Sequence, residues 1–459
     1  MDPPPATSQF TGRLKLAIAV VAYEAALILA YVEWVSPAYG YQSFVNRHPS
    51  LALVTIACIF AAIPVIWIQQ EIRRPSQMIY WILFLLAYIP SQLMPWFVLT
   101  SPSLILRWNL TLLISMWLIH AISRHSPRHN LVAFETRTAF MLLAGAIAAI
   151  TIVIAAREGV SPSSISLSGV YTRRLQFSTT AASLGGAVGY LVPWTGNVVN
   201  PLLIAFGLSK HSRVLVLAGI CGQLLLFGLH GEKTILLSPL FIYLIYRVLR
   251  SGKLHRVGYR LTVAAGTITA LGAILALRFN MTVLMNYVVR RVMLVPGVLS
   301  SFYLDFFSAH QHTLFAHTLL KGFLRSPYPL PVPFLIGTTY IHNPTTAANA
   351  NIFADGYAGY GFIGVIFIAA LTGVVLRALD LTACRRDRLT VLCVSGMLGL
   401  TMSNGALSTS LITHGIILAM ALFALMPPEP EHGGGRGRAS LRLSSDSSIG
   451  IRSLSLSGR

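Results

Sequence analysis

The chain has 459 residues, of which 55% are hydrophobic and only 10% are charged, and its mean hydropathy is +0.68. Soluble globular proteins carry about 25% charged residues, so this composition excludes a soluble enzyme, a soluble nucleic-acid-binding domain and a disordered scaffold. The formal net charge of +20 is typical of a membrane protein whose cytoplasmic loops collect Lys and Arg. We therefore expect a membrane as partner and no nucleic acid.

Twelve apolar runs are long enough to predict transmembrane helices, which need about 20 residues each. They are residues 14–35, 51–69, 78–99, 104–123, 138–156, 180–208, 213–229, 234–249, 259–278, 357–378, 389–404 and 409–426. Only four residues separate the seventh run from the eighth, which predicts a tight hairpin there. The expected fold is an all-α polytopic membrane protein with one integral membrane domain over residues 1–426.

The distribution of Lys and Arg predicts the orientation of these spans. With a cytoplasmic N-terminus, most of the 34 basic residues fall in inner segments, and each inner segment holds at least two of them. This asymmetry places both termini in the cytoplasm. Residues 427–459 are rich in Gly, Ser and Arg and poor in aromatic side chains, which predicts a disordered cytoplasmic tail.

Two outer segments are long, and function concentrates in long loops at one end of a rigid scaffold. The first, residues 157–179, is rich in Ser, and the second covers residues 279–356. Charged residues interrupt each apolar run of the second segment, so we expect short amphipathic pieces at the membrane interface rather than another crossing.

The outer segments also contain more cations than the positive-inside rule predicts. Among them are the doublets Arg173–Arg174 and Arg290–Arg291, together with Lys233. Because Arg binds phosphate groups bidentately and stays charged near a membrane, these residues predict a site for a lipid phosphate or pyrophosphate. The alternative is that they reach the phosphates of the outer leaflet or bond to loop carbonyls.

Several kinds of chemistry have no signature in the sequence. It contains no Asp-x-Asp, no glycine-rich phosphate loop and no Gly-x-Ser-x-Gly, which argues against a metal-held nucleotide-sugar donor. His310 and His312 lack a neighbouring cluster of carboxylates or cysteines, so we expect no metal and no cofactor. Glu24 lies in the middle of the first span, where either a functional carboxylate or a protonated structural one is compatible with the sequence.

The most distinctive stretch covers residues 348–364, which lead from the long outer segment into the tenth span. It delivers Asn349, Asn351 and Asp355 to the membrane surface and then places four glycines, at positions 356, 359, 361 and 364, where they allow close helix approach. Polar side chains at this depth need partners, and a sugar would supply them.

With four other motifs, this stretch resembles the bacterial oligosaccharide repeat-unit polymerases, the Wzy-type polymerases of O-antigen and capsule. The other motifs are residues 170–174, 231–234, 290–296 and 303–307. The resemblance covers roughly residues 165–380, and the first four spans match in hydropathy only. It implies a GT-C-like fold of about 12 transmembrane helices in the bacterial inner membrane, with the active site facing the periplasm.

The resemblance also implies an activity, namely metal-independent polymerisation of undecaprenyl-pyrophosphate-linked repeat units at the outer leaflet. Its partners would be the lipid-linked glycan donor and acceptor, with a chain-length regulator as a further candidate. Asp355 is the first choice for the base that activates the acceptor, with Asp305 and His317 behind it. The expected pyrophosphate-binding residues are Arg173, Arg174, Arg290, Arg291 and Lys233. The expected sugar-binding residues are Tyr340, Asn349, Asn351 and Tyr357.

Two other functions compete with this interpretation. An O-antigen ligase uses the same donor with another acceptor, and a transporter or flippase also commonly has twelve spans with both ends inside. A carrier built from two six-span halves is expected to show corresponding halves, whereas this chain has its longest loop outside, between the ninth and tenth spans. We therefore favour the polymerase.

Overall fold

The computed structural model describes residues 6–125, 188–251 and 256–428, with a few more between 138 and 149. All regular secondary structure in these ranges is helical, apart from one isolated β-bridge between Lys321 and Leu324. The chain divides into two units after Pro428, and all described residues belong to the first unit. The predicted all-α class is therefore confirmed for the described residues.

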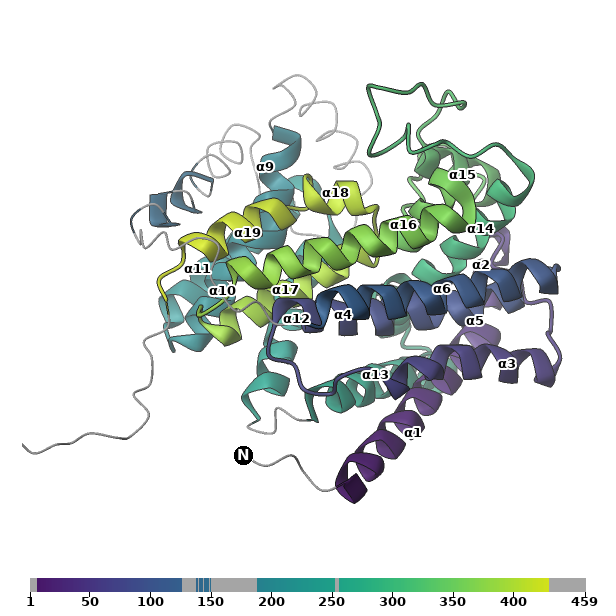
Figure 1. Cartoon of the computed structure of the whole chain (residues 1–459), viewed down its shortest axis with the longest axis horizontal. Helices are drawn as coiled ribbons and strands as arrows, with labels where there is room; N and C mark the ends of the chain where they lie inside the picture. The colour runs from purple at the N-terminus through teal and green to yellow at the C-terminus, as the bar shows by residue number, and fades with distance from the viewer. Residues whose placement is uncertain are drawn as a thin grey trace, which may run out of the picture. The chain divides into compact units, whose positions relative to one another are not determined.

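The helices follow each other along the chain with mostly short connections (Figure 1). The first part contains α1 (Ala6–Ala30), η1 (Tyr31–Val35), α2 (Ser36–Tyr39), η2 (Gly40–Gln42), α3 (Leu51–Ala62), η3 (Ile63–Ile66), α4 (Pro75–Leu83), η4 (Phe84–Tyr88), α5 (Ile89–Val98) and α6 (Pro102–Ser123). The second part contains α9 (Val188–Trp194), η6 (Thr195–Val199), α10 (Asn200–Ser209), α11 (Arg213–His230), α12 (Lys233–Arg250), α13 (Val257–Phe279), η8 (Met285–Leu294), α14 (Val295–Ala309), α15 (Val332–Tyr340), α16 (Ile352–Thr382), α17 (Arg388–Met402), α18 (Leu407–Leu411) and α19 (Ile416–Leu425).

Eight helical stretches are long and apolar enough to cross a membrane. They are Thr11–Gln42, Pro75–Val98, Pro102–Ser123, Gly189–Ser209, Val257–Phe279, Met285–Ala309, Ile352–Thr382 and Leu407–Leu425. Three shorter apolar helices, Leu51–Ile66, Arg213–Leu229 and Arg388–Met402, also coincide with predicted spans. The chain is therefore a polytopic helical membrane protein. The predicted span 138–156 lies largely outside the described residues, and the predicted loop 157–179 lies wholly outside them.

The continuous stretch α4–η4–α5 forms the centre of the packing. It is mostly apolar and nearly every one of its residues is buried, as expected of a helix that other helices surround. α14 and α3 pack against α5, α17 packs against α4, and α6 lies beside α16 along much of its length. Glu24 is also buried, in α1, with the Cys58 thiol of α3 as its neighbour.

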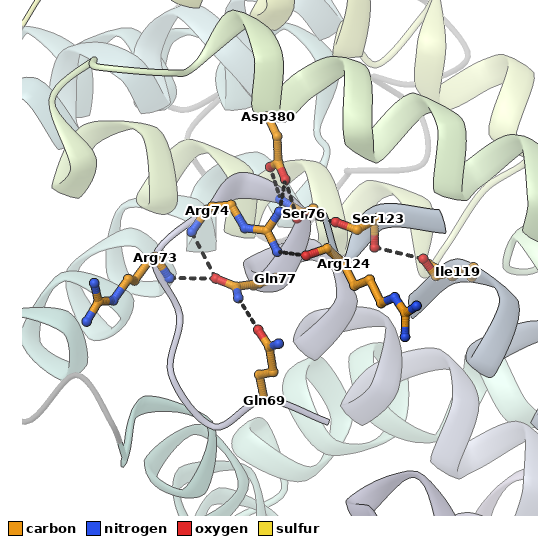
Figure 2. Close-up of polar contacts among 9 residues, drawn as sticks. All are labelled: Gln69, Arg73, Arg74, Ser76, Gln77, Ile119, Ser123, Arg124 and Asp380. Carbon is orange, nitrogen blue, oxygen red and sulfur yellow. Dashed lines mark hydrogen bonds and ion pairs between the residues drawn. The ribbon is translucent and has the colours of Figure 1, made fainter. Parts of the chain in front are cut away.

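A buried carboxylate joins three helices at the end where α4 begins and α6 and α16 finish, which we call the Asp380 end (Figure 2). Asp380 of α16 accepts hydrogen bonds from the backbone N–H and the hydroxyl of Ser76, at 2.8 and 2.6 Å. It thereby pairs an amide in the first turn of α4, where helical N–H groups lack intrahelical partners. Arg74 donates to Asp380 at 3.2 Å and also to the carbonyls of Ser123 and Arg124 where α6 finishes.

This junction predicts a large difference between two substitutions. Asp380→Ala leaves the guanidinium of Arg74 and the amide of Ser76 without their partner in a buried site, and we expect it to lower the free energy of unfolding by about 3 kcal/mol. Arg73→Ala removes an exposed ion pair with Glu71 and is expected to cost less than about 1 kcal/mol. Thermal unfolding of both variants in detergent measures this difference, and equal losses would contradict the role of Asp380.

Residues 285–309 differ from the sequence prediction. Short amphipathic pieces were expected, but η8 and α14 follow each other without a loop, and together they are long and apolar enough to cross a membrane. Charged residues do not end these helices, because the Arg290 guanidinium lies 4.1 Å from the centre of the Tyr39 ring and Asp305 reaches the surface near the end of α14. The segment is therefore more helical than predicted, and its position at the membrane interface stays a prediction.

Both ends of this helix nevertheless contact the same end of the bundle. Near its start, Asn286 accepts a 2.6 Å hydrogen bond from Tyr39, and near its end Phe302 contacts Phe44. The rings of Tyr39 and Phe44 are only 6.1 Å apart. Between these points Met293 contacts the middle of α13. The helix therefore begins and finishes near the end of the bundle where α5 finishes and α6 and α16 begin, which we call the Asn351 end.

Candidate functional site

The candidate site is built on a break in α16. Tyr360 and Gly361 leave helical geometry, and Gly361 has φ +59° and ψ −148°, a conformation that essentially only glycine adopts. The break separates an eight-residue first piece, residues 352–359, from the long remainder of the helix. The two pieces fold closely together, since a Cβ added at Gly364 would lie 2.1 Å from the carbonyl oxygen of Gly356. The glycines thus allow the close approach that the sequence predicts.

The break leaves carbonyl groups without helical partners, and a loop residue pairs one of them. The carbonyl oxygen of Ala358 accepts from the backbone N–H of Thr313 at 2.9 Å and from its hydroxyl at 3.0 Å. This places the loop that follows α14 against the first piece of α16. Thr313 is itself buried, so its side chain is held in one position.

From Thr313 a chain of hydrogen bonds leads to the carboxylate of Asp355. The Thr313 hydroxyl lies 2.5 Å from Nδ1 of His317, and Nε2 of His317 lies 2.9 Å from Oδ1 of Asp355. An ionised carboxylate only accepts hydrogen bonds, so Nε2 is the donor in this pair. Oδ2 of Asp355 makes no hydrogen bond within the described part of the chain. The structure thus brings together two of the three predicted base candidates and leaves one carboxylate oxygen for another proton donor.

Asn351 fixes the start of α16. Its side-chain oxygen accepts from the free amides of Phe353 and Ala354 at 3.0 and 3.2 Å, which is the geometry of an N-cap. Its amide nitrogen lies within 3.1 Å of the hydroxyl oxygens of Ser91 in α5 and Ser300 in α14. The side chain is fully buried, so its hydrogen-bonding groups hold three helices together.

Asp305, the third base candidate, lies in a separate part of the site. It is exposed and accepts a 2.7 Å hydrogen bond from the hydroxyl of Tyr340. Burial raises the pKa of Tyr340 above its ordinary value, and the bond to Asp305 adds to this effect, so the tyrosine remains a donor. Its ring stacks on Phe302 at 4.6 Å and 6°.

Two of the predicted cations lie over aromatic rings near the same helix. Arg290 lies over Tyr39, and the ammonium of Lys233 lies 4.4 Å from the centre of the Tyr287 ring. Contact with an aromatic face stabilises a partly desolvated cation. Nε of Arg290 is buried and has no hydrogen-bond partner within the described residues. Tyr287 and Arg290 are one turn apart on η8, so both cations lie close to this element.

The remaining predicted residues are distributed differently. Arg291 is exposed on η8, and Asn349 is exposed just before α16. Tyr357 is buried in the first piece of α16, where its ring contacts Trp108 and His312. Arg173 and Arg174 lie outside the described residues.

Sequence reasoning missed Thr313 and Tyr39. Thr313 and Tyr39 carry no motif, and their roles depend on partners 45 and 247 residues away in the chain. His312 stands in the noted pair with His310, but it packs on aromatic rings, and burial lowers its pKa. Within the described ranges no three His, Cys, Asp or Glu side chains gather in a way that could hold a metal.

We compared the chain with protein-family models, with curated proteins and with solved structures, and none of the three comparisons found a match.

Two neighbouring asparagines differ in burial, and we expect them to differ in their contribution to stability. Asn351→Ala removes the N-cap and the bonds to α5 and α14, and we expect it to lower the free energy of unfolding by about 3 kcal/mol. Asn349→Ala changes an exposed side chain and is expected to cost about 0.5 kcal/mol or less. Thermal unfolding in detergent tests the pair. A stable Asn351→Ala variant would contradict the capping role.

Proposed function

We propose that this protein is a glycosyltransferase of the inner membrane that polymerises polyprenyl-pyrophosphate-linked oligosaccharide repeat units. The observation that carries the proposal is a carboxylate, Asp355, that His317 holds by one oxygen at the end of the bundle where Arg290 and Lys233 also lie. A base and a group of cations are the two requirements for transferring a sugar from a pyrophosphate.

In the proposed reaction the hydroxyl of a terminal sugar on one lipid-linked repeat unit attacks the anomeric carbon of a second glycan. The hydroxyl proton goes to Oδ2 of Asp355, and the bond between the anomeric carbon and the pyrophosphate oxygen breaks. The pyrophosphate leaves with the electron pair and stays attached to its polyprenyl chain. His317 donates to the other oxygen of Asp355 and so fixes the orientation of the carboxylate.

The leaving pyrophosphate gains negative charge in this reaction, and nearby cations would stabilise it. Arg290 is the first choice, because it is partly exposed and Tyr39 orders its guanidinium. Lys233 and Arg291 would add positive charge around it, and Arg173 and Arg174 keep the role that the sequence predicts. Tyr340 and Asn349 are partly or fully exposed and remain the preferred sugar contacts.

The proposed topology has twelve spans and a GT-C-like arrangement. In it the stretch Met285–Ala309 enters the membrane from the Asn351 end as η8 and returns to that end as α14, as the contacts with Tyr39 and Phe44 favour. The other seven long apolar stretches, the three shorter ones, α12 and the predicted span 138–156 then account for twelve crossings. Arg73, Arg74 and Arg124 at the Asp380 end favour a cytoplasmic position for that end, so the Asn351 end faces the periplasm.

The base assignment predicts that Asp355→Asn lowers the rate of polymerisation about 100-fold or more, because the amide cannot take the hydroxyl proton. The assay is chain-length analysis of glycan made by purified protein in vesicles supplied with lipid-linked repeat units. Glu71→Gln, which changes an exposed carboxylate near the Asp380 end, is the matched control. Asp305→Asn tests the alternative, and loss of polymer in that variant alone would transfer the role of base to Asp305.

The pyrophosphate assignment predicts that Arg290→Ala removes long-chain polymer and leaves single repeat units and the protein level intact. We expect a loss of about 100-fold, typical of removing one preorganised donor to a developing oxyanion. Arg290→Lys keeps the charge but not bidentate binding and should recover part of the rate. Arg291→Ala is measured in parallel, and unchanged chain length in both alanine variants would contradict the pyrophosphate site. If the protein were a ligase, the Arg290→Ala variant would instead fail to attach any repeat unit to the acceptor.

A further inference from the structure

The loop that carries His317 exposes an unusual number of apolar side chains. Phe323 is 87% exposed, and Leu314, Leu320, Leu324 and Leu330 are each at least 40% exposed. These residues lie within residues 314–330, between α14 and α15. A soluble surface rarely gathers so many large apolar side chains in one short segment. The loop therefore has the composition of a surface that contacts an apolar environment.

The backbone of the loop is paired within itself. The amide of Leu320 donates to the carbonyl of Phe315 at 2.9 Å, and the amides of Phe323 and Leu324 both donate to Leu320, at 3.0 and 3.1 Å. Lys321 donates in the same way to Thr318 at 3.3 Å. A non-helical segment enters a water-poor environment more readily where its backbone groups have partners, and these four amides at the tip of the loop have them.

The loop joins the exposed apolar side of α16. The ring of Phe315 lies 5.6 Å from that of Phe367, and Phe367 belongs to a stripe with Ile363 and Val374, which are 51%, 66% and 54% exposed respectively. Their spacing places all three on one face of the helix. Since α16 is long and apolar enough to cross a membrane, this face has the composition of a lipid-facing surface, and the loop lies beside it.

Two cations stand beside the apolar tip. Lys321 and Arg325 are exposed, and neither has an ion-pair partner within the described residues. We propose that residues 314–330 form a membrane-surface anchor. In it Phe323 and Leu324 enter the boundary between headgroups and acyl chains at the Asn351 end, while Lys321 and Arg325 bind anionic phospholipid headgroups. Apolar side chains flanked by Lys and Arg are the composition of segments that lie in this boundary.

The bilayer fits this surface better than a second copy of the chain does. The apolar residues continue an existing lipid-facing stripe, and the adjacent cations match the negative charge of phospholipid headgroups. The anchor does not depend on the reaction proposed above. It has a consequence for the site, because His317 lies within the same loop and would be held at the level of the lipid headgroups.

A photo-crosslinking experiment tests the anchor in the full chain. The photoreactive p-benzoyl-phenylalanine replaces Phe323 in one variant and the exposed Thr345 in the control, and both proteins are reconstituted in vesicles containing phosphatidylglycerol. After irradiation, mass spectrometry should find about tenfold more lipid adduct at position 323 than at position 345, as expected for a side chain that transfers from water to lipid. Equal adduct formation, or crosslinks from position 323 to a second copy of the chain, would overturn the proposal.

The double variant Lys321→Gln and Arg325→Gln tests the contribution of charge. Each cation near an anionic surface contributes to binding, so the adduct at position 323 should fall about fivefold or more in vesicles containing phosphatidylglycerol. It should change less in vesicles of phosphatidylcholine alone. An equal fall in both kinds of vesicle would contradict binding of anionic headgroups.

Discussion

The break in α16 is the constraint on which the Asn351 end depends. Interrupting a helix inside a packed membrane protein frees backbone groups that no water can pair. Thr313 meets this requirement at the carbonyl of Ala358, while Asn351 caps the amides at the start of the same helix. The contact of Thr313 also brings the loop with His317 to Asp355. The hydrogen-bonded group that we propose as catalytic is therefore a direct consequence of how the break is satisfied.

The two ends of the bundle differ in how they use polar side chains. At the Asp380 end, the carboxylate of Asp380 and the guanidinium of Arg74 form hydrogen bonds to groups at helix termini. Their role is therefore to hold the helices together. At the Asn351 end, Asp355 keeps an oxygen and Arg290 a nitrogen without a partner within the described residues. These are polar groups whose bonding capacity the described residues do not fill, which is the property expected of groups that meet a ligand.

Some features of the fold could be predicted because they are local properties of the chain. Hydropathy over 15–25 residues located most of the described membrane helices, since each span must cover its own stretch of hydrocarbon. It did not predict how much of residues 285–309 is helical, because charge was read as an interruption, whereas the Tyr39 ring covers Arg290 from a helix far away in the sequence. It also gave no sign that Asn351 would be buried as a cap rather than exposed as a sugar contact.

The sequence by itself determined the membrane class, the positions of the cations along the chain and the glycine-rich entry to α16, because each depends only on composition and on neighbouring residues. The tertiary structure decided the partner of every key polar group. Asp380 meets Ser76 across 304 residues, Asn351 meets Ser91 across 260, and His317 meets Asp355 across 38. Such pairs form where packed helices meet, and buried polar groups take whichever partner the packing provides. Whether a given Asn or Asp serves the fold or the site is therefore set by helix packing, which no local pattern encodes.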